Sequence, residues 1–368
     1  MTLFSPGPTN IAEEVRLALL ADDVCHREPE FCELLLQTCV DIARVAGGDT
    51  DYQATPFFAS ATGCNEAILS SIRGDLLILV AGRYSKRVAA AASQLGIFHR
   101  TLSFDSLTGI DMELVAREAL ANSYSYMFVV HNETSTGVLA PLCELGAFCR
   151  EQGIELIVDG VSSVGAHDFS LVRSNIACCS LSINKCIEGV PGVAFVVGRR
   201  DFFCSLKGCS RSFYFDLYEQ WSTLWERGQP RFTASTQVVA AAQTALKRLL
   251  LETVERRTAR YRATKLYLEA KLRERGVRLL TLPPEKQSNV ITLAYLPGGT
   301  NYMDVHQRLK DAGFTIYTDT EIIERGMFSI ATMGQISLAD VDRFIAALDG
   351  ALSPRLTGTV PQAYAGVG

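Results

Sequence analysis

A lysine and an aspartate have the side chains best suited to covalent chemistry in this sequence. Lys185 lies in the segment 182–192, directly before a Gly/Pro turn, and Asp159 follows the apolar run 154–158. In an open α/β sheet, ligands bind outside the carboxyl ends of the strands. A lysine there can hold pyridoxal phosphate as an imine while the acid keeps the pyridine nitrogen protonated. The pair alone fits equally well with Asp159 as a helix cap and Lys185 on the surface.

A turn of small and hydroxyl residues offers a place for a phosphate. It has the sequence Ser60-Ala61-Thr62-Gly63 and precedes a predicted helix that runs to residue 72. The free N–H groups and the dipole at such a helix start favour an anion. A helix cap without any ligand explains the same residues equally well.

Apolar runs alternate with amphipathic segments through the first half of the chain. The runs 56–59, 76–80, 98–102, 126–130, 154–158 and 193–197 are predicted strands, and 11–20, 31–45, 60–72, 85–94 and 142–151 are predicted helices. This alternation predicts an α/β fold with a mostly parallel, doubly wound sheet.

The periodicity changes after residue 197. A long helical stretch, 236–274, is expected to break near Glu252, and strands at 277–282, 289–296, 315–317 and 327–331 with helices at 302–312 and 339–347 predict a small α+β domain. We expect an N-terminal arm (1–15), a large domain (16–250), a small C-terminal domain (251–353) and a tail (354–368).

The composition is that of an ordinary globular protein. The chain has 368 residues, of which 48% are hydrophobic and 20% charged, and its net charge is −5. This balance argues against general nucleic-acid binding or attraction to membranes. The eleven cysteines form no CxxC pair and no zinc-like spacing, so we expect reduced thiols and no metal site. With neither a secretion signal nor a membrane span in the sequence, we expect a cytoplasmic protein.

Four segments together resemble a known family. The segments 60–63, 131–137, 159–163 and 182–185, in this order and spacing, resemble the class V aminotransferases of fold type I. The segments 5–8, 25–31, 184–192, 215–218 and 231–233 make the chain more similar to the 2-aminoethylphosphonate–pyruvate aminotransferases within that class. The resemblance spans about residues 3 to 350.

The resemblance implies a pyridoxal phosphate site with roles for individual residues. Lys185 and Asp159 are the implied catalytic pair, with Lys185 carrying the cofactor and moving a proton. The phosphate is expected at Ser60, Thr62 and Gly63, with Thr233 reaching it from the partner subunit of a homodimer with shared sites. The other implied cofactor contacts are Thr134, beside the ring hydroxyl, Val161, on one ring face, and Ser182. Thr134 is also compatible with a plain strand end, and His131 with either ring stacking or a buried structural role.

One position departs from the family pattern. Relatives have an arginine in the strand before the last helix that binds the substrate's carboxylate or phosphonate, whereas this chain has Ser329. A serine cannot form a bidentate ion pair. We expect Arg27 to replace this anchor, with Arg231 and Arg211 as further candidates and Gly7 and Ser329 also at the substrate. A solvated Arg27 paired with a nearby glutamate is an equally good alternative.

Three functions fit these features. The first is transfer of the amino group of an amino phosphonate, with 2-aminoethylphosphonate and pyruvate giving phosphonoacetaldehyde and alanine through pyridoxamine phosphate. The second keeps the cofactor but changes the chemistry to a lyase or to a transaminase with another amino donor and keto acid, in line with Ser329. The third is a regulatory subunit without turnover, against which Lys185 and Asp159 both argue.

Overall fold

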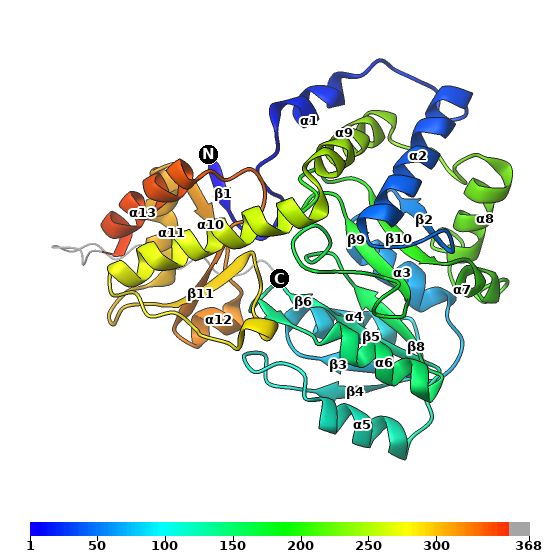
Figure 1. The fold of residues 1–368 in the computed structure, drawn as a ribbon, viewed down its shortest axis with the longest axis horizontal. Helices are drawn as coiled ribbons and strands as arrows, with labels where there is room; N and C mark the ends of the chain where they lie inside the picture. The colour runs from blue at the N-terminus through cyan, green and yellow to red at the C-terminus, as the bar shows by residue number, and fades with distance from the viewer. Residues whose placement is uncertain (353–368) are drawn as a thin grey trace.

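A seven-stranded sheet forms the centre of the larger part of the molecule in the computed structural model, which describes residues 1–352 (Figure 1). Its strands, in spatial order, are β2 (Tyr52–Phe57), β10 (Ala194–Arg199), β9 (Ile176–Ser182), β8 (Glu155–Asp159), β5 (Tyr126–Val130), β3 (Leu76–Val80) and β4 (His99–Ser103). The pairs from β9 to β4 are parallel, and β10 is antiparallel to both its neighbours. The predicted mostly parallel sheet is therefore confirmed.

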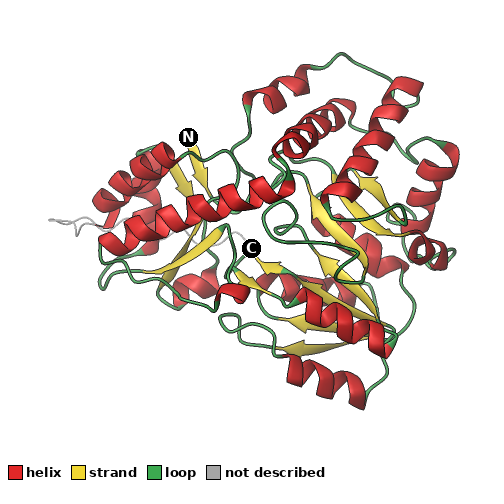
Figure 2. Ribbon diagram, viewed as in Figure 1, coloured by secondary structure: helices red, strands yellow, loops and turns green. Residues whose placement is uncertain are grey.

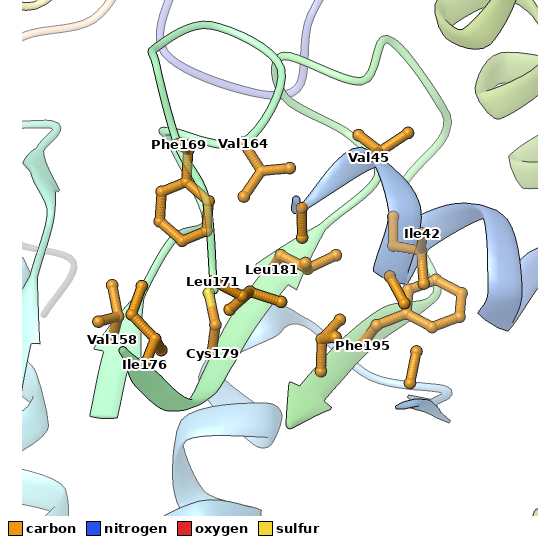
Figure 3. Close-up of a cluster of buried hydrophobic side chains, with 14 of the residues drawn as sticks. Ile42, Val45, Val158, Val164, Phe169, Leu171, Ile176, Cys179, Leu181 and Phe195 are labelled. Carbon is orange, nitrogen blue, oxygen red and sulfur yellow. The ribbon is translucent and has the colours of Figure 1, made fainter. Parts of the chain in front are cut away.

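Helices cover both faces of this sheet because the buried strands are apolar on both sides (Figure 2). One face packs against α2 (Pro29–Val45), α5 (Met112–Ala121), α6 (Leu142–Gln152) and α9 (Thr236–Glu252). The other packs against α3 (Ala61–Ser71), α4 (Arg83–Gln94), α7 (Arg200–Ser205) and α8 (Leu217–Arg227). Alternate residues of one strand take part in the two cores: Leu156 and Val158 point to the first face and Ile157 to the second. Figure 3 shows part of the first core, where Ile42 of α2 and Phe195 of β10 lie in the same apolar cluster.

The second part of the molecule is a small α+β unit with its own core. It contains α10 (Val254–Glu274), β11 (Ile291–Tyr295), α11 (Tyr302–Asp311), β12 (Phe314–Ile316), α12 (Thr320–Glu324), β13 (Met327–Ala331) and α13 (Leu338–Leu352). The N-terminal strand β1 (Thr2–Phe4) pairs in parallel with β12, and the ring of Phe4 stacks on Phe344 at a centroid distance of 4.2 Å. The predicted arm thus begins as a strand of this unit.

Short elements complete the described chain: α1 (Glu13–Leu17), the 3-10 helices η1 (Ala18–Leu20) and η2 (Pro284–Lys286), and the hairpin strands β6 (Asn132–Glu133) and β7 (Val138–Leu139). The break between α9 and α10 falls at Thr253, whose φ of 72° lies in the left-handed region. The predicted domain limits remain predictions, and the predicted tail, 354–368, lies outside the described residues. No helix within residues 1–352 is long and apolar enough to cross a membrane.

Some elements of the structure differ from the sequence-based predictions. The predicted strand 277–282 is only a bridge between Leu279 and Ala294, since two prolines, Pro283 and Pro284, follow and cannot donate hydrogen bonds to a sheet. No strand is predicted where the structure has β9, and no helix is predicted before β5, where the structure has α5. Asp111 caps this helix by accepting a hydrogen bond from the Glu113 backbone N–H at 2.9 Å, a signal that the sequence does contain.

Candidate active site

The carboxyl ends of two neighbouring strands bring the lysine and the aspartate to one cavity. Asp159 ends β8, and Lys185 follows β9, which pairs with β8. The cavity measures about 230 Å³. Of the residues predicted from the sequence, those that line it are Gly7, Ser60, Thr62, Thr134, Asp159, Val161, Ser182 and Lys185. The structure thus places eight predicted residues around one space, as expected for a ligand site at the strand ends.

Asp159 is buried, and both of its carboxylate oxygens accept hydrogen bonds. The Asn65 side chain donates to Oδ2 at 2.8 Å, and the Val161 backbone N–H donates to Oδ1 at 3.0 Å. Burial raises the pKa of Asp159, while these hydrogen bonds and the cations of Lys185 and Arg87 oppose the increase. The carboxylate is therefore fixed in orientation and is sensitive to any cationic group that enters the cavity.

The Lys185 side chain lines the same cavity as this acid. Its Nζ donates to the hydroxyl of Ser162 at 3.0 Å and lies 5.4 Å from the centre of the Tyr84 ring. Burial lowers the pKa of the Lys185 amine, and the nearby Asp159 carboxylate works against this shift. Loss of hydration favours the neutral amine, which is the form that attacks a carbonyl carbon.

Two other segments hold Lys185 in place. The N-terminal segment passes over it: a Cβ added to Gly7 would lie 3.3 Å from Lys185 Cγ, and the Thr9 hydroxyl donates to the Lys185 carbonyl at 3.3 Å. Gly7 also has a φ of 133°, so a side chain there would be strained as well as crowded. On the other side, the segment after Lys185 is bound by residues of α10.

This second support is a buried ionic network around Glu188. Its carboxylate accepts a hydrogen bond from the Tyr261 hydroxyl at 2.7 Å and forms ion pairs with Arg260 at 2.8 Å and Arg257 at 3.4 Å. Arg257, itself buried, also donates to the Cys186 carbonyl at 3.1 Å. The residue next to Lys185 is therefore held by a helix of the small α+β unit.

The start of α3 faces the cavity with free donor groups. Ser60 is the N-cap, and its hydroxyl makes no capping hydrogen bond to the helix. Ser60 and Thr62 both line the cavity, whereas Gly63 lies behind them, where an added Cβ would come within 3.1 Å of the Phe215 ring. Gly63 thus permits the close packing of α3, and the hydroxyls and N–H groups in front of it suit a phosphate.

The cavity has further side chains that the sequence analysis missed. Tyr84 and Arg87, both on α4, line it, as does Asn65 of α3, and Ser162 links Lys185 to Thr134 through a hydroxyl contact of 2.5 Å. The helix start that carries Tyr84 is capped by the buried Glu133, which accepts from the Tyr84 N–H at 2.9 Å. The motif containing Glu133 was noted in the sequence, but its proximity to α4 was not.

Besides Gly63, three residues predicted at the site do not line the cavity of this chain. Thr233 is exposed on the segment after α8. The Arg27 guanidinium donates to the backbone carbonyls of Pro230 and Arg231. Ser329 is buried in β13, and its hydroxyl donates to the Tyr317 carbonyl at 2.6 Å.

His131 also lies away from this cavity. Its ring is buried beside Phe169, at a centroid distance of 5.6 Å, and beside His167, at 5.8 Å. Its Nδ1 is buried with no hydrogen-bond partner among the described residues. Of the two alternatives, the structure supports a buried structural histidine, and Tyr84 is the aromatic ring at the cavity.

The groups around the cavity fit pyridoxal phosphate. A partly buried lysine, an acid held by two hydrogen bonds, an aromatic ring and an uncapped helix start surround one space. The side-chain oxygen of Asn65, Oδ1, is buried without a hydrogen-bond partner. The amide nitrogen of the same side chain is the group that donates to Asp159. Within residues 1–352, no three His, Cys, Asp or Glu side chains are grouped so that they could hold a metal ion.

This fold and this site define a pyridoxal-phosphate-dependent aminotransferase. The family model of the class V aminotransferases matches residues 22–320, and the chain belongs to this family. Members of the family depend on pyridoxal phosphate in general.

Individual relatives narrow the comparison. The 2-aminoethylphosphonate–pyruvate transaminase of Aeromonas hydrophila is 34% identical over 363 residues, which cover 95% of this chain and 94% of that protein. The protein of the same name from Salmonella typhimurium is 32% identical over 360 residues, covering 95% and 97%. Among solved structures, the ureidoglycine–glyoxylate aminotransferase of Bacillus subtilis superposes with a TM-score of 0.90 at 25% identity, over 95% of this chain and 92% of that one.

Proposed function

We propose that this aminotransferase takes the amino group from a small amino phosphonate, with 2-aminoethylphosphonate as the prototype, and passes it to pyruvate. The products are phosphonoacetaldehyde and alanine, formed in two half-reactions on one site. The observation that carries the proposal is the meeting of Lys185, Asp159 and the α3 start at one cavity. The substrate choice draws on the names of the relatives that match nearly the whole chain.

Pyridoxal phosphate, when bound, supplies an electron sink for the charge that develops at the substrate carbon when it loses a proton. Lys185 carries the cofactor covalently and then moves this proton as general base and acid, for which the lowered pKa of its amine is well suited. Asp159 would pair with the ring nitrogen and would keep it protonated. Thr134 is assigned to the ring hydroxyl, Val161 to a ring face, and Ser182 to the same pocket.

The phosphate of the cofactor is assigned to Ser60, Thr62 and the α3 start in front of Gly63. We propose that Thr233 reaches this phosphate from a second copy of the chain, because it is exposed and does not line the cavity of its own subunit. Arg27 supports this arrangement, since its guanidinium holds the carbonyls of Pro230 and Arg231 just before Thr233. The proposed unit is a homodimer with shared sites.

Ser329 favours a second candidate function. Its hydroxyl is occupied by the Tyr317 carbonyl, and its backbone N–H donates to Thr318 at 2.9 Å, so the position that relatives use for an arginine provides no positive charge. A lyase, or a transaminase for a different amine, is therefore the alternative, with the same roles for Lys185 and Asp159.

A half-reaction screen distinguishes the two candidates. The yellow holoenzyme is mixed with single amines in the absence of a keto acid, and conversion to the pyridoxamine form is followed by absorbance. We expect 2-aminoethylphosphonate to convert the cofactor and Lys185→Ala to abolish both the conversion and the covalent attachment. In the return half-reaction, Ser329→Arg should use pyruvate better. Release of product from an amine without formation of the pyridoxamine form would favour the lyase.

A further inference from the structure

Helix α4 presents three cations near the cavity, and two of them are already paired. Arg83 forms an ion pair with Asp319 and donates to the Tyr317 hydroxyl at 3.2 Å. Lys86 pairs with Glu321 at 2.8 Å. Both contacts join α4 to the small α+β unit, so these two positive charges have structural partners.

Arg87 differs from both. Its side chain is exposed and lines the cavity, and among the residues of the described chain it forms neither an ion pair nor a hydrogen bond. Its guanidinium carbon lies 5.0 Å from the centre of the Tyr84 ring, while the Lys185 amine lies 5.4 Å from the same centre. The ring holds the guanidinium near the cavity without using its N–H donors, which stay available to a ligand.

The other possible anchors for an anion are engaged elsewhere. Arg27 binds backbone carbonyls outside the cavity, Arg211 donates to the Ile72 carbonyl at 3.0 Å, and Arg231 donates to the Phe213 carbonyl at 2.8 Å. The α3 start is assigned to the phosphate of the cofactor. A second anion at this site, such as the phosphonate of an amino substrate, must still meet a positive charge, because an unpaired anion in a partly buried site is costly.

We propose that Arg87 binds the phosphonate group of the amino substrate and so replaces the arginine missing at position 329. This inference rests on the proposed function and names the residue that sets its preference for an anionic amine. A guanidinium offers two parallel N–H donors to two oxygens of a phosphonate, a geometry that a lysine cannot reproduce. The side chain is exposed, so it can turn from the ring toward the ligand without repacking the core.

The test measures binding without turnover. Methylphosphonate, which has no amino group, is titrated by calorimetry into the holoenzyme, whose phosphate site is filled by the cofactor. Arg87→Met should raise the dissociation constant roughly 10- to 150-fold, the effect of losing one charge-assisted contact. Arg87→Lys should recover only part of this loss. The control is Lys86→Met, which removes the same charge from the next position of the helix and should leave the dissociation constant unchanged.

Two further measurements show whether Arg87 binds the phosphonate of the substrate or the phosphate of the cofactor. The dissociation constant of pyridoxal phosphate for the apoprotein should be equal in the parent and in Arg87→Met; a weakened cofactor with unchanged methylphosphonate binding would assign Arg87 to the cofactor and overturn the proposal. In the half-reactions, Arg87→Met should impair 2-aminoethylphosphonate and leave an uncharged amine of similar size unaffected. Equal losses for both amines would also overturn it.

The proposal and the proposed function fail separately. If Arg87→Met and Lys86→Met bind methylphosphonate equally well, Arg87 is not the anchor. The proposed function still stands in that case if 2-aminoethylphosphonate converts the cofactor. If 2-aminoethylphosphonate leaves the cofactor unchanged while methylphosphonate binds through Arg87, the anion site stands and the reaction is a different one.

Discussion

Lys185 and Asp159 both lose water at the strand ends, and burial shifts each of them toward its neutral form. Their mutual attraction opposes both shifts, so the charge of either group depends on the other. A cofactor with a positive ring nitrogen beside Asp159 therefore also affects the Lys185 amine. The pairing of β8 with β9 brings the two residues to one cavity, where this coupling can act.

The buried His131 predicts how stability depends on pH. Burial lowers the pKa of His131 to about 3, whereas an unfolded histidine titrates near 6.5. The contribution to stability is complete above about pH 6.5 and is lost as the pH falls toward about 3, because only the unfolded chain then takes up the proton. At pH 5 we expect this one residue to cost ~2 kcal/mol relative to pH 7.

Equilibrium urea denaturation at both pH values tests this. His131→Phe should reduce the fall in the free energy of unfolding between pH 7 and pH 5 by that amount. The matched variant His26→Gln, in the exposed loop before α2, should not change it. A parent and a His131→Phe protein with the same pH dependence would contradict the assignment.

At the scale of elements, α10 supports the segment that carries Lys185. The buried Arg257 joins Glu188, Glu252 and the Cys186 carbonyl, so its removal leaves Glu188 with fewer partners in a dry environment. We expect Arg257→Met to lower the free energy of unfolding by about 3–5 kcal/mol, the usual result of breaking a buried pair from one side.

The neighbouring arginine provides the control for this prediction. Arg256 precedes Arg257 on the same helix and is exposed, so Arg256→Met should change stability by less than about 0.5 kcal/mol. Arg257→Met should also slow the half-reaction, since the residue after Lys185 loses its support. Equal stabilities of the two variants in urea would show that the network does not hold this segment.

Most strands of the sheet could be predicted because their sequences are strongly apolar. The strands β3, β5 and β8 contain apolar runs, and Asp159 follows the run in β8. The strand before Lys185, β9, mixes cysteines and serines with apolar residues and was not predicted. Tyr84 and Arg87 could not be found in this way. They lie on α4, which follows β3, and in the sheet β5 stands between β3 and β8. Spatial strand order is a property of the whole fold and leaves no local signal.

The contacts of the predicted substrate residue Arg27 could not be predicted either, because they also depend on the whole fold. Arg27 has the charge expected of an anchor, but in the folded chain its donors are used by carbonyls more than two hundred residues away in sequence. Nothing near Arg27 in the sequence indicates those partners. Gly7, in contrast, lies at the cavity as expected, against the stem of Lys185.

For the whole molecule, the proposed dimer makes a prediction about one exposed ring. Phe213 is 78% exposed and lies beside Phe232, with Arg231 over its ring at 4.9 Å, next to the segment that carries Thr233. An interface with twofold symmetry uses each residue twice. Phe213→Glu should therefore weaken the dimer at least roughly 100-fold, as expected when two aromatic contacts are lost.

Sedimentation over a range of protein concentrations tests this, together with the retention of pyridoxal phosphate after gel filtration. The variant should be monomeric and lose the cofactor, because Thr233 then no longer reaches the partner's phosphate site. Phe98→Glu is the control. Phe98 is 67% exposed and directly precedes β4, which is the edge strand at the other end of the sheet from β2. This variant should remain dimeric. A dimeric Phe213→Glu protein would place the interface elsewhere.

The first ten residues form contacts with segments that are synthesised much later. They are synthesised first, yet β1 pairs with β12 and Phe4 packs on Phe344, partners that emerge some three hundred residues later. Between these contacts and α1, Gly7 and Thr9 lie against Lys185. Contacts so distant in sequence form late and slow the search for the native state. The nascent chain can thus assemble its central sheet early in synthesis, but this wall of the active site is completed only once β12 and α13 have been made.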